Sequence, residues 1–412
     1  MILFRIYHIA NRTLDIIGRI FFNTADIHIK FPLQRRKLNK LITNKLIPKV
    51  AFVKQDVNDD LYCCPENSSP VSIIRSTLGR PGPVALFTKF DADFYIVETE
   101  PDPECNIWKE KWTERRWCPI EYFEKFREKV PGRKYGQKVF AVKAKTVDWG
   151  KYDIVISNDI SVPERITRNY PQVVWCYYIR EVTTSSYKNS HMQPIRGQDI
   201  SLNQRFRPVR LSPKVMPHEI EFPYHLHYSG CFQEMCNFPF DDNNRSGIFL
   251  EHHTVADLDS TQLERLKSFG TVRSTAILPE GTVDRWEESQ SRRTMDPEFM
   301  EDFMKSKYFV KCGGRAVWGT AMVEAIAMGC LVIGDPKVMP HGFIYDKYTT
   351  VSTFSDVIAR ISFLEKNEKI YQRVLMRQRR LVDYLCYIRP SLELFKNAQR
   401  VVAEKMKIGR NK

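Results

Sequence analysis

Apolar residues along this chain occur either as short continuous runs or at the spacing of three to four that predicts amphipathic helices. In the first half, apolar runs predict strands at 83–90, 93–100, 137–144, 152–159 and 172–179, with helical spacing at 119–130 and 162–170. Strands that alternate with helices are typical of a parallel α/β sheet. The N-terminal 50 residues predict an amphipathic first helix followed by a basic segment.

A second series of the same kind follows a loop-rich stretch at 181–245. Strands are expected at 247–253, 271–278, 307–312 and 330–336, helices at 259–269, 297–306 and 320–328, and a long helical stretch at 354–407 interrupted at Pro390. Two α/β halves joined by loops indicate two domains. We therefore expect an N-terminal domain at 1–235, a second domain at 236–385, and a C-terminal helix at 386–412 that packs back on the first.

Length and composition agree with two globular domains. The chain has 412 residues, of which 43% are hydrophobic. No run of 18 uninterrupted apolar residues occurs, and charged residues break the apolar N-terminus, so we expect neither a membrane span nor a secretory signal.

The ten cysteines lack the paired C-x-x-C spacing of a zinc site. Unpaired thiols predict a reducing, cytoplasmic location.

The net charge of +14 is concentrated at both ends of the chain. Residues 1–54 hold eleven Lys/Arg and two acids, and residues 371–412 hold eleven Lys/Arg and three acids. This excess indicates an anionic partner, which is a nucleotide, a membrane surface or a nucleic acid, or else solvated helix faces. The chain shows no helix-turn-helix, zinc-finger or aromatic–basic RNA motif, so no nucleic-acid partner is expected. A peripheral membrane contact by the first helix stays open beside core packing.

One stretch, "KYFVKCGGRAVWGTAMVEAIAMGCLVIGDP" at 307–336, carries the strongest candidate chemistry. Gly313 and Gly314 follow the predicted strand and permit close approach of a ligand to the backbone. The next helix is expected to start near Gly319 and Thr320, where free N–H groups favour a phosphate. Arg315 adds a planar charge suited to a diphosphate.

Glu324 lies one helical turn beyond Thr320, on the same helix face. Because helical side chains lean toward the N-terminus, the carboxylate is expected at the mouth of this site. A carboxylate there accepts hydrogen bonds from two neighbouring hydroxyls, as a ribose diol would offer. The alternative is an acid that merely stabilises the positive end of the helix.

The string "MVEAIAMGCLVIGD" resembles the nucleotide-binding segment of GT-B glycosyltransferases, and is similar to that of exostosin-like and glycogen-synthase-type transferases. The resemblance implies two Rossmann-like domains facing across a cleft, with the C-terminal helix crossing back to the first. It also implies donor-ribose contact by Glu324 and donor-phosphate contact by the glycine loop. Ala316 stands where retaining families often carry a second glutamate, which leaves the stereochemistry open.

Three further residues are candidates for catalysis or donor binding. Asp159 ends the strand 152–159 and could deprotonate an acceptor hydroxyl, or else cap the following helix. His191, in the loop "SSYKNSHMQPIRGQ", is a second candidate base. His253 ends the strand 247–253, where contacts to a phosphate or a base would fall.

The function expected is metal-independent transfer of a hexosyl or deoxyhexosyl group from a nucleotide-sugar donor to a glycan or another hydroxyl acceptor. No bound cofactor is expected, and the nucleotide-diphosphate sugar is a substrate. One alternative is a sugar-nucleotide epimerase on the same fold. Another is a GT-A-like transferase, in which Asp91 and Asp93 would hold a divalent metal; otherwise this D-x-D is a surface turn.

Overall fold

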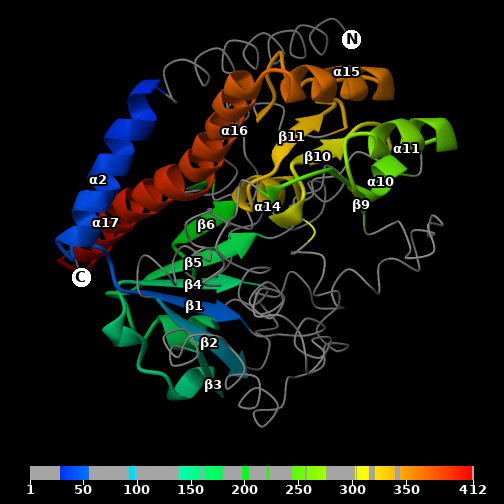
Figure 1. The fold of residues 1–412 in the computed structure, drawn as a ribbon. Coiled ribbons are helices and arrows are strands. Elements are labelled where there is room, and N and C mark those ends of the chain that lie inside the picture. The colour runs from blue at the N-terminus through cyan, green and yellow to red at the C-terminus, as the bar shows by residue number, and fades with distance from the viewer. Residues whose placement is uncertain are drawn as a thin grey trace, which may run out of the picture. The chain divides into compact units, whose positions relative to one another are not determined.

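The computed structural model describes two α/β units (Figure 1). The described residues are 28–54, 92–98, 139–158, 162–179, 197–203, 220–221, 244–255, 258–274, 302, 304–314, 321–338 and 344–410. The first unit holds those up to residue 221 together with 385–410, and the second holds 244–384. Each unit contains one sheet in which every described strand pair is parallel.

The first unit is built on a seven-stranded sheet in the order β3-β2-β1-β4-β5-β6-β7. The strands are β1 (Val50–Lys54), β2 (Asp93–Glu98), β3 (Val139–Lys143), β4 (Ile154–Asn158), β5 (Val174–Ile179), β6 (Ile200–Asn203) and β7 (Ile220–Glu221). After β3 the chain returns to the other side of β1, so the carboxyl ends of β1 and β4 lie side by side. Ligands of open α/β sheets bind at such a reversal of strand order.

Short helices and two long ones complete the first unit. The short elements are the 3₁₀ turns η3 (Ala144–Thr146) and η4 (Trp149–Lys151) and the single-turn helix α8 (Glu164–Thr167). The long ones are α2 (Phe31–Thr43) and α17 (Arg389–Arg410), which lie side by side (Figure 1). Buried Trp149 and Trp175 meet edge to face, with ring centroids 5.9 Å apart, within the core of this unit.

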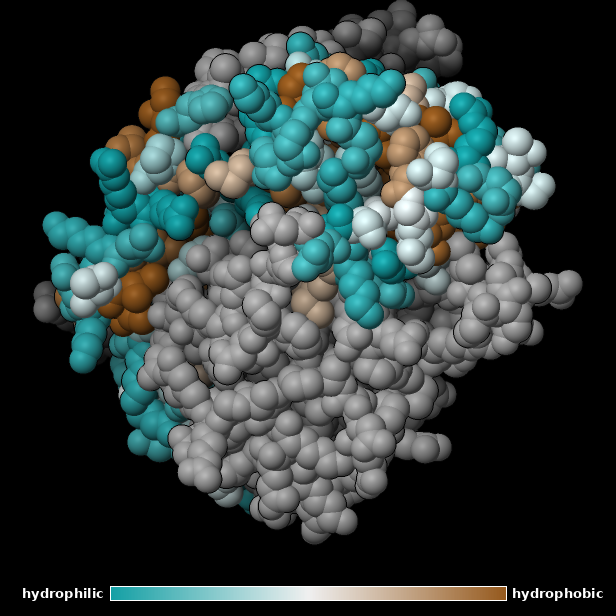
Figure 2. All heavy atoms as spheres, viewed as in Figure 1, coloured by the Kyte–Doolittle hydropathy of each residue, from teal (hydrophilic) through white to brown (hydrophobic). Residues whose placement is uncertain are grey.

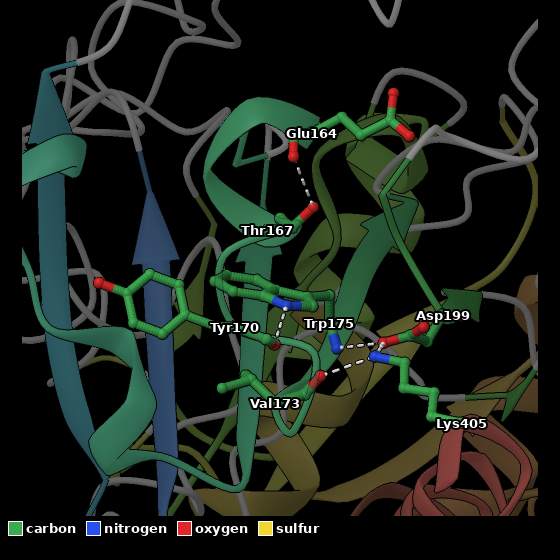
Figure 3. Close-up of polar contacts among 7 residues, drawn as sticks. All are labelled: Glu164, Thr167, Tyr170, Val173, Trp175, Asp199 and Lys405. Carbon is green, nitrogen blue, oxygen red and sulfur yellow. Dashed lines mark hydrogen bonds and ion pairs between the residues drawn. The ribbon is translucent and has the colours of Figure 1, made fainter. Parts of the chain in front are cut away.

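Helix α17 is fastened to the sheet by one charged side chain (Figure 3). Lys405 Nζ lies 2.6 Å from Asp199 Oδ2 and donates to the carbonyl oxygen of Val173 at 2.8 Å. The same Asp199 oxygen accepts the Trp175 N–H at 2.8 Å. These acceptors lie at the amino ends of β5 and β6, so the clamp joins the helix to the edge opposite the carboxyl ends.

The second unit is built on a four-stranded sheet in the order β11-β10-β8-β9. The strands are β8 (Ile248–Leu250), β9 (Val272–Arg273), β10 (Tyr308–Lys311) and β11 (Leu331–Gly334). The helices are α10 (His252–Val255), α11 (Ser260–Lys267), α14 (Ala321–Ala327), α15 (Phe354–Glu365) and α16 (Glu368–Asp383), and a π-helical segment, η8 (Tyr384–Ile388), leads into α17. Buried side chains of the strands, α11, α15 and α16 form one apolar core.

Helix α16 closes the outer edge of β11 with a side chain. The amide of buried Gln378 accepts the Val332 N–H and donates to the Val332 carbonyl, each at 2.8 Å. An edge strand exposes backbone groups that need partners. Gln378 therefore replaces the neighbouring strand that β11 lacks among the described residues.

Most expected elements within the described residues are confirmed, and the differences have local causes. The strands expected at 152–159, 172–179, 307–312 and 330–336 are β4, β5, β10 and β11. The expected strand at 247–253 ends early, because His252 and the residues after it turn into α10. The expected long helix breaks at Lys366 and Asn367 rather than at Pro390, which occupies the first turn of α17.

Other elements were not anticipated or cannot be compared. Strands β1, β6 and β7 were missed, and the N-terminal basic segment is itself helix α2. The strand expected at 83–90 and the helix expected at 119–130 lie outside the described residues. Every helix in the described segments is too short or too polar to cross a bilayer.

Substituting Gln378 by Met tests the edge closure. The variant leaves the buried N–H and carbonyl of Val332 without partners, so we expect a loss of about 2–4 kcal/mol in the free energy of unfolding. Urea titration followed by far-UV circular dichroism measures it. Gln372→Met, on the exposed side of the same helix, is the matched control and should change the value by less than about 0.5 kcal/mol. Equal effects of the two variants would contradict this role.

Candidate functional site

The candidate site lies at the reversal of strand order in the second sheet. Strands β8 and β10 are neighbours, with β9 beyond β8 on one side and β11 beyond β10 on the other. The chain runs from β8 to β9 and then returns to the far side of β8 to form β10. The segments after β8 and β10 therefore leave the sheet at the position where open α/β sheets bind ligands.

Two glycines turn the chain at the end of β10. Gly313 and Gly314 have φ of 72° and 68°, in the left-handed region that favours glycine. The backbone thus turns at two successive residues without the strain that a Cβ atom would bring. Without side chains here, the backbone permits close approach by a ligand.

A buried ion pair precedes this turn. The register that pairs Val310 with Leu250 brings Lys311 opposite Glu251, and Lys311 Nζ lies 2.8 Å from Glu251 Oε2. The Lys311 side chain is 0% exposed, and its ammonium has no partner in hydrogen-bonding geometry within the described structure. Removing an ammonium from water is costly unless its protons are satisfied. In the described structure the Glu251 carboxylate is the neighbour that compensates this buried cation.

Backbone contacts hold the ends of the site strands in place. The Oγ1 atom of buried Thr254, in α10, accepts the Cys312 N–H at 3.1 Å, which ties α10 to the segment after β10. Asp335, buried directly after β11, donates its N–H to the Lys311 carbonyl at 2.9 Å, and its side chain accepts the Lys337 N–H at 2.8 Å. Three charged residues, Glu251, Lys311 and Asp335, thus terminate three adjacent strands.

Helix α14, which carries Glu324, is stopped by a glycine and a buried arginine. Gly329 has φ of 102°, and the Gly329 and Cys330 N–H groups bond back to the carbonyls of Ile326 and Ala325 at 3.1 and 2.8 Å. This is the Schellman arrangement, which satisfies carbonyls at a helix end. Arg245 donates to the carbonyls of Met328 and Ser306, placing a cation at the negative end of the helix. A side chain at position 329 would collide with this arginine.

Four of the sequence-predicted donor residues lie within the described part of the chain. Gly313 and Gly314 lie directly after β10, and the backbones of Glu324 and His253 lie in α14 and α10. The side chains of the latter two are not described. Arg315, Gly319, Thr320, Asp159 and His191 lie outside the described residues.

Sequence reasoning overlooked the three charged residues that end the strands. Their signal is a charge that closes an apolar run, as in "IFLE", "YFVK" and "VIGD". A charge at the end of an apolar run is common, and a lysine there is usually solvated. The burial of Lys311 distinguishes this position, and burial depends on the tertiary structure.

Of the two aspartates in the D-x-D motif, Asp93 lies within the described residues. Asp93 is the first residue of β2, and the strand expected before the motif, 83–90, lies outside the described residues. Its carboxylate accepts the Tyr152 hydroxyl, and the Tyr95 and Tyr152 hydroxyl oxygens are 2.6 Å apart. Burial, together with the hydrogen bond to Asp93, raises the pKa of Tyr152 far above its ordinary value. Asp93 therefore belongs to a polar cluster at the amino ends of the strands, and Asp91 lies outside the described residues.

Solved structures similar to this chain are glycosyltransferases. An O-GlcNAc transferase mutant of Thermobaculum terrenum has a TM-score of 0.40 at 10% identity, covering 88% of this chain and 69% of that one. Sucrose-phosphate synthase from Thermosynechococcus elongatus has a TM-score of 0.37 at 12% identity, covering 88% and 98%. T4 phage β-glucosyltransferase has a TM-score of 0.38 at 11% identity, covering 86% of this chain and 99% of that one. A complex of that phage enzyme with UDP and Mn²⁺ also matches.

No protein-family model matches the chain, and no curated protein matches it in sequence. Likeness this distant transfers neither a substrate nor a site residue.

A double-mutant cycle on Lys311 and Glu251 tests the buried pair. Lys311→Met removes the cation that faces the buried carboxylate of Glu251, so we expect a loss of about 3–5 kcal/mol in the free energy of unfolding. Lys311→Met combined with Glu251→Met should recover most of that loss, because no charge is left buried alone. Urea titration measures both variants. Strictly additive losses would contradict the pairing.

Proposed function

We propose that this protein is a glycosyltransferase that binds a nucleotide-sugar donor at the carboxyl edge of the sheet β11-β10-β8-β9. One observation carries the proposal: Lys311, buried and paired with Glu251, lies two residues before a glycine turn at the reversal of strand order. A glycine turn that lets a ligand approach the backbone, beside a desolvated cation, suits a diphosphate, because backbone N–H groups and cations both stabilise negative charge. The "MVEAIAMGCLVIGD" segment that follows supports the same assignment.

Each candidate residue of the donor site has a distinct role in this proposal. Lys311 and the N–H groups at Gly313 and Gly314 balance the charge of the donor diphosphate as it leaves. Glu324 accepts hydrogen bonds from the ribose diol. Contacts to the phosphates or the base are assigned to the remaining donor-site candidates, Arg315, Gly319, Thr320 and His253.

The acceptor is proposed to bind at the carboxyl edge of the first sheet. Asp159 directly follows β4, and β4 pairs with β1 at the reversal of strand order in that unit. A base there takes the proton of the acceptor hydroxyl as that oxygen bonds to the sugar and the bond to the diphosphate breaks. Asp159 and His191 are the two candidates for this base, and the acceptor is a glycan or another hydroxyl compound. The transferred group is a hexosyl or deoxyhexosyl unit.

Binding of a UDP-, GDP- or dTDP-sugar, found by titrating each, gives the assay for Glu324. Glu324→Gln keeps the shape and removes the charge, so we expect donor affinity to fall by roughly one to two orders of magnitude. A 2′-deoxy donor should bind wild type more weakly than the parent donor, yet lose little further affinity in the variant. One shared interaction cannot be lost twice.

Two results separate a binding role of Glu324 from a structural one. The thermal midpoint without ligand should change little in Glu324→Gln. A variant that binds the donor as tightly as wild type but unfolds much earlier would make Glu324 a structural helix residue. The double variant of Lys311 and Glu251 gives an independent check, since it should be folded yet bind donor weakly.

Metal dependence distinguishes the two transferase types. Lys311 and the glycine turn supply positive charge and N–H donors for the diphosphate, so we expect transfer to continue in excess EDTA. The measurement is donor turnover with EDTA, and then with added Mn²⁺ or Mg²⁺. Loss of turnover with EDTA and recovery with Mn²⁺ would instead favour a metal-dependent transferase in which the D-x-D motif, Asp91 with Asp93, holds the metal.

A further inference from the structure

Most of the net positive charge lies on two neighbouring helices of the first unit, α2 with its flanking residues and α17. Residues 28–49 contain seven Lys/Arg and no acid, and residues 389–410 contain six Lys/Arg and two acids. Together they supply eleven of the fourteen net charges of the chain. Helices α2 and α17 pack against each other within the first unit, so these charges gather on one part of it.

The exposed side of α2 carries aliphatic and basic side chains in one stripe. Phe31 and Leu38 are buried on the side of the helix that faces the protein. The opposite side presents residues at helical spacing that are all exposed, namely Ile29, Leu33, Arg36, Lys37 and Lys40. Leu33 is 59% exposed and Ile29, in the turn before the helix, is 58% exposed. Large aliphatic side chains beside basic ones on one exposed helix side match the mixed apolar and cationic surface that contacts an anionic membrane.

The same combination recurs where α2 and α17 end. Leu46 is 65% exposed, and Met406 and Ile408 are each 61% exposed on either side of Lys407. Together with Ile29 and Leu33, these three hydrophobic residues are the five most exposed large hydrophobic side chains in the described part of the chain. Figure 2 shows hydrophobic and hydrophilic atoms interleaved over this region, at the left of the view.

We propose that the α2/α17 surface, defined as Ile29, Leu33, Arg36, Lys37, Lys40, Leu46, Met406, Lys407 and Ile408, binds an anionic lipid bilayer. Aliphatic side chains enter the boundary between head groups and acyl chains, and the cations meet the negative head groups. Both helices lie along the membrane surface in this arrangement, and none of the described helices needs to span it. The inference stands independently of the proposed function.

The chemistry of this surface favours a bilayer over a nucleic acid. Phosphate-backbone binding requires cations and is strengthened by aromatic side chains that stack on bases. Exposed aliphatic residues add nothing to it. A bilayer uses both components, because each buried aliphatic group and each cation contributes to binding.

Vesicle flotation with the full-length chain tests the proposal. The probes are vesicles of phosphatidylcholine alone and of phosphatidylcholine mixed with phosphatidylglycerol. We expect binding to the mixed vesicles and little to the neutral ones. Arg36→Gln combined with Lys40→Gln should lower the partition coefficient on mixed vesicles by roughly twentyfold, and Leu33→Gln by about fivefold.

Matched variants in the second unit control for general charge and hydrophobicity. Lys366→Gln combined with Lys369→Gln removes two exposed cations, and Met376→Gln removes an aliphatic side chain that is 46% exposed. Neither should change vesicle binding. Circular dichroism and the thermal midpoint check that every variant is folded.

Two results would overturn the proposal. One is equal loss of vesicle binding in the surface variants and the controls, which would indicate non-specific attraction. The other is absence of vesicle binding together with salt-sensitive binding of duplex DNA that is weakened by Arg36→Gln/Lys40→Gln but unchanged by Leu33→Gln. That result would assign the surface to a nucleic acid.

Discussion

Parallel strand pairing is the constraint on which both units of this protein depend. A parallel strand cannot return through a tight turn, so each strand needs a crossover, and both faces of the sheet need cover. All strands of a sheet therefore end at the same edge, and their carboxyl ends meet there. The four-stranded sheet uses this property to bring Glu251, Lys311 and Asp335 together from distant parts of the chain.

The buried Lys311–Glu251 pair is best understood through that constraint. An apolar pair at these positions would pack without the cost of removing charges from water. Such a pair exists two residues earlier on the same strands, where the rings of Phe249 and Phe309 stack. The charged pair lies beyond these rings, directly before the glycine turn. Its placement at the mouth of the sheet agrees with a role in binding an anion rather than in stability.

The other edges of the structure show what parallel pairing leaves unsolved. The edge strand β11 is completed by the amide of Gln378 from α16, and the amino ends of β5 and β6 are capped by Lys405 from α17. Both devices use side chains of the C-terminal helices. The C-terminal helices therefore supply hydrogen-bond partners to the sheets that they cover. The exposed face of α17 remains available for another partner.

The sequence by itself determined the fold class and the position of the candidate site. Apolar runs such as "YFVK" and "LVIG" are short and flanked by glycine or polar residues, which favours buried strands, and the glycine pair marks the turn between strand and helix. These are local properties, since hydrophobic periodicity and glycine backbone freedom need no distant partner.

Only the tertiary structure decided which residues meet. Strand β1 was missed because "VAFVK" directly follows a basic stretch and has little local signal, yet it lies at the centre of its sheet by pairing with β2 and β4. The ion pair of Lys311 with Glu251 depends on the register of two strands that are far apart in the sequence, and the bond of Gln378 to Val332 depends on how α16 packs. Strand order, register and burial arise from long-range contacts, which no local pattern encodes.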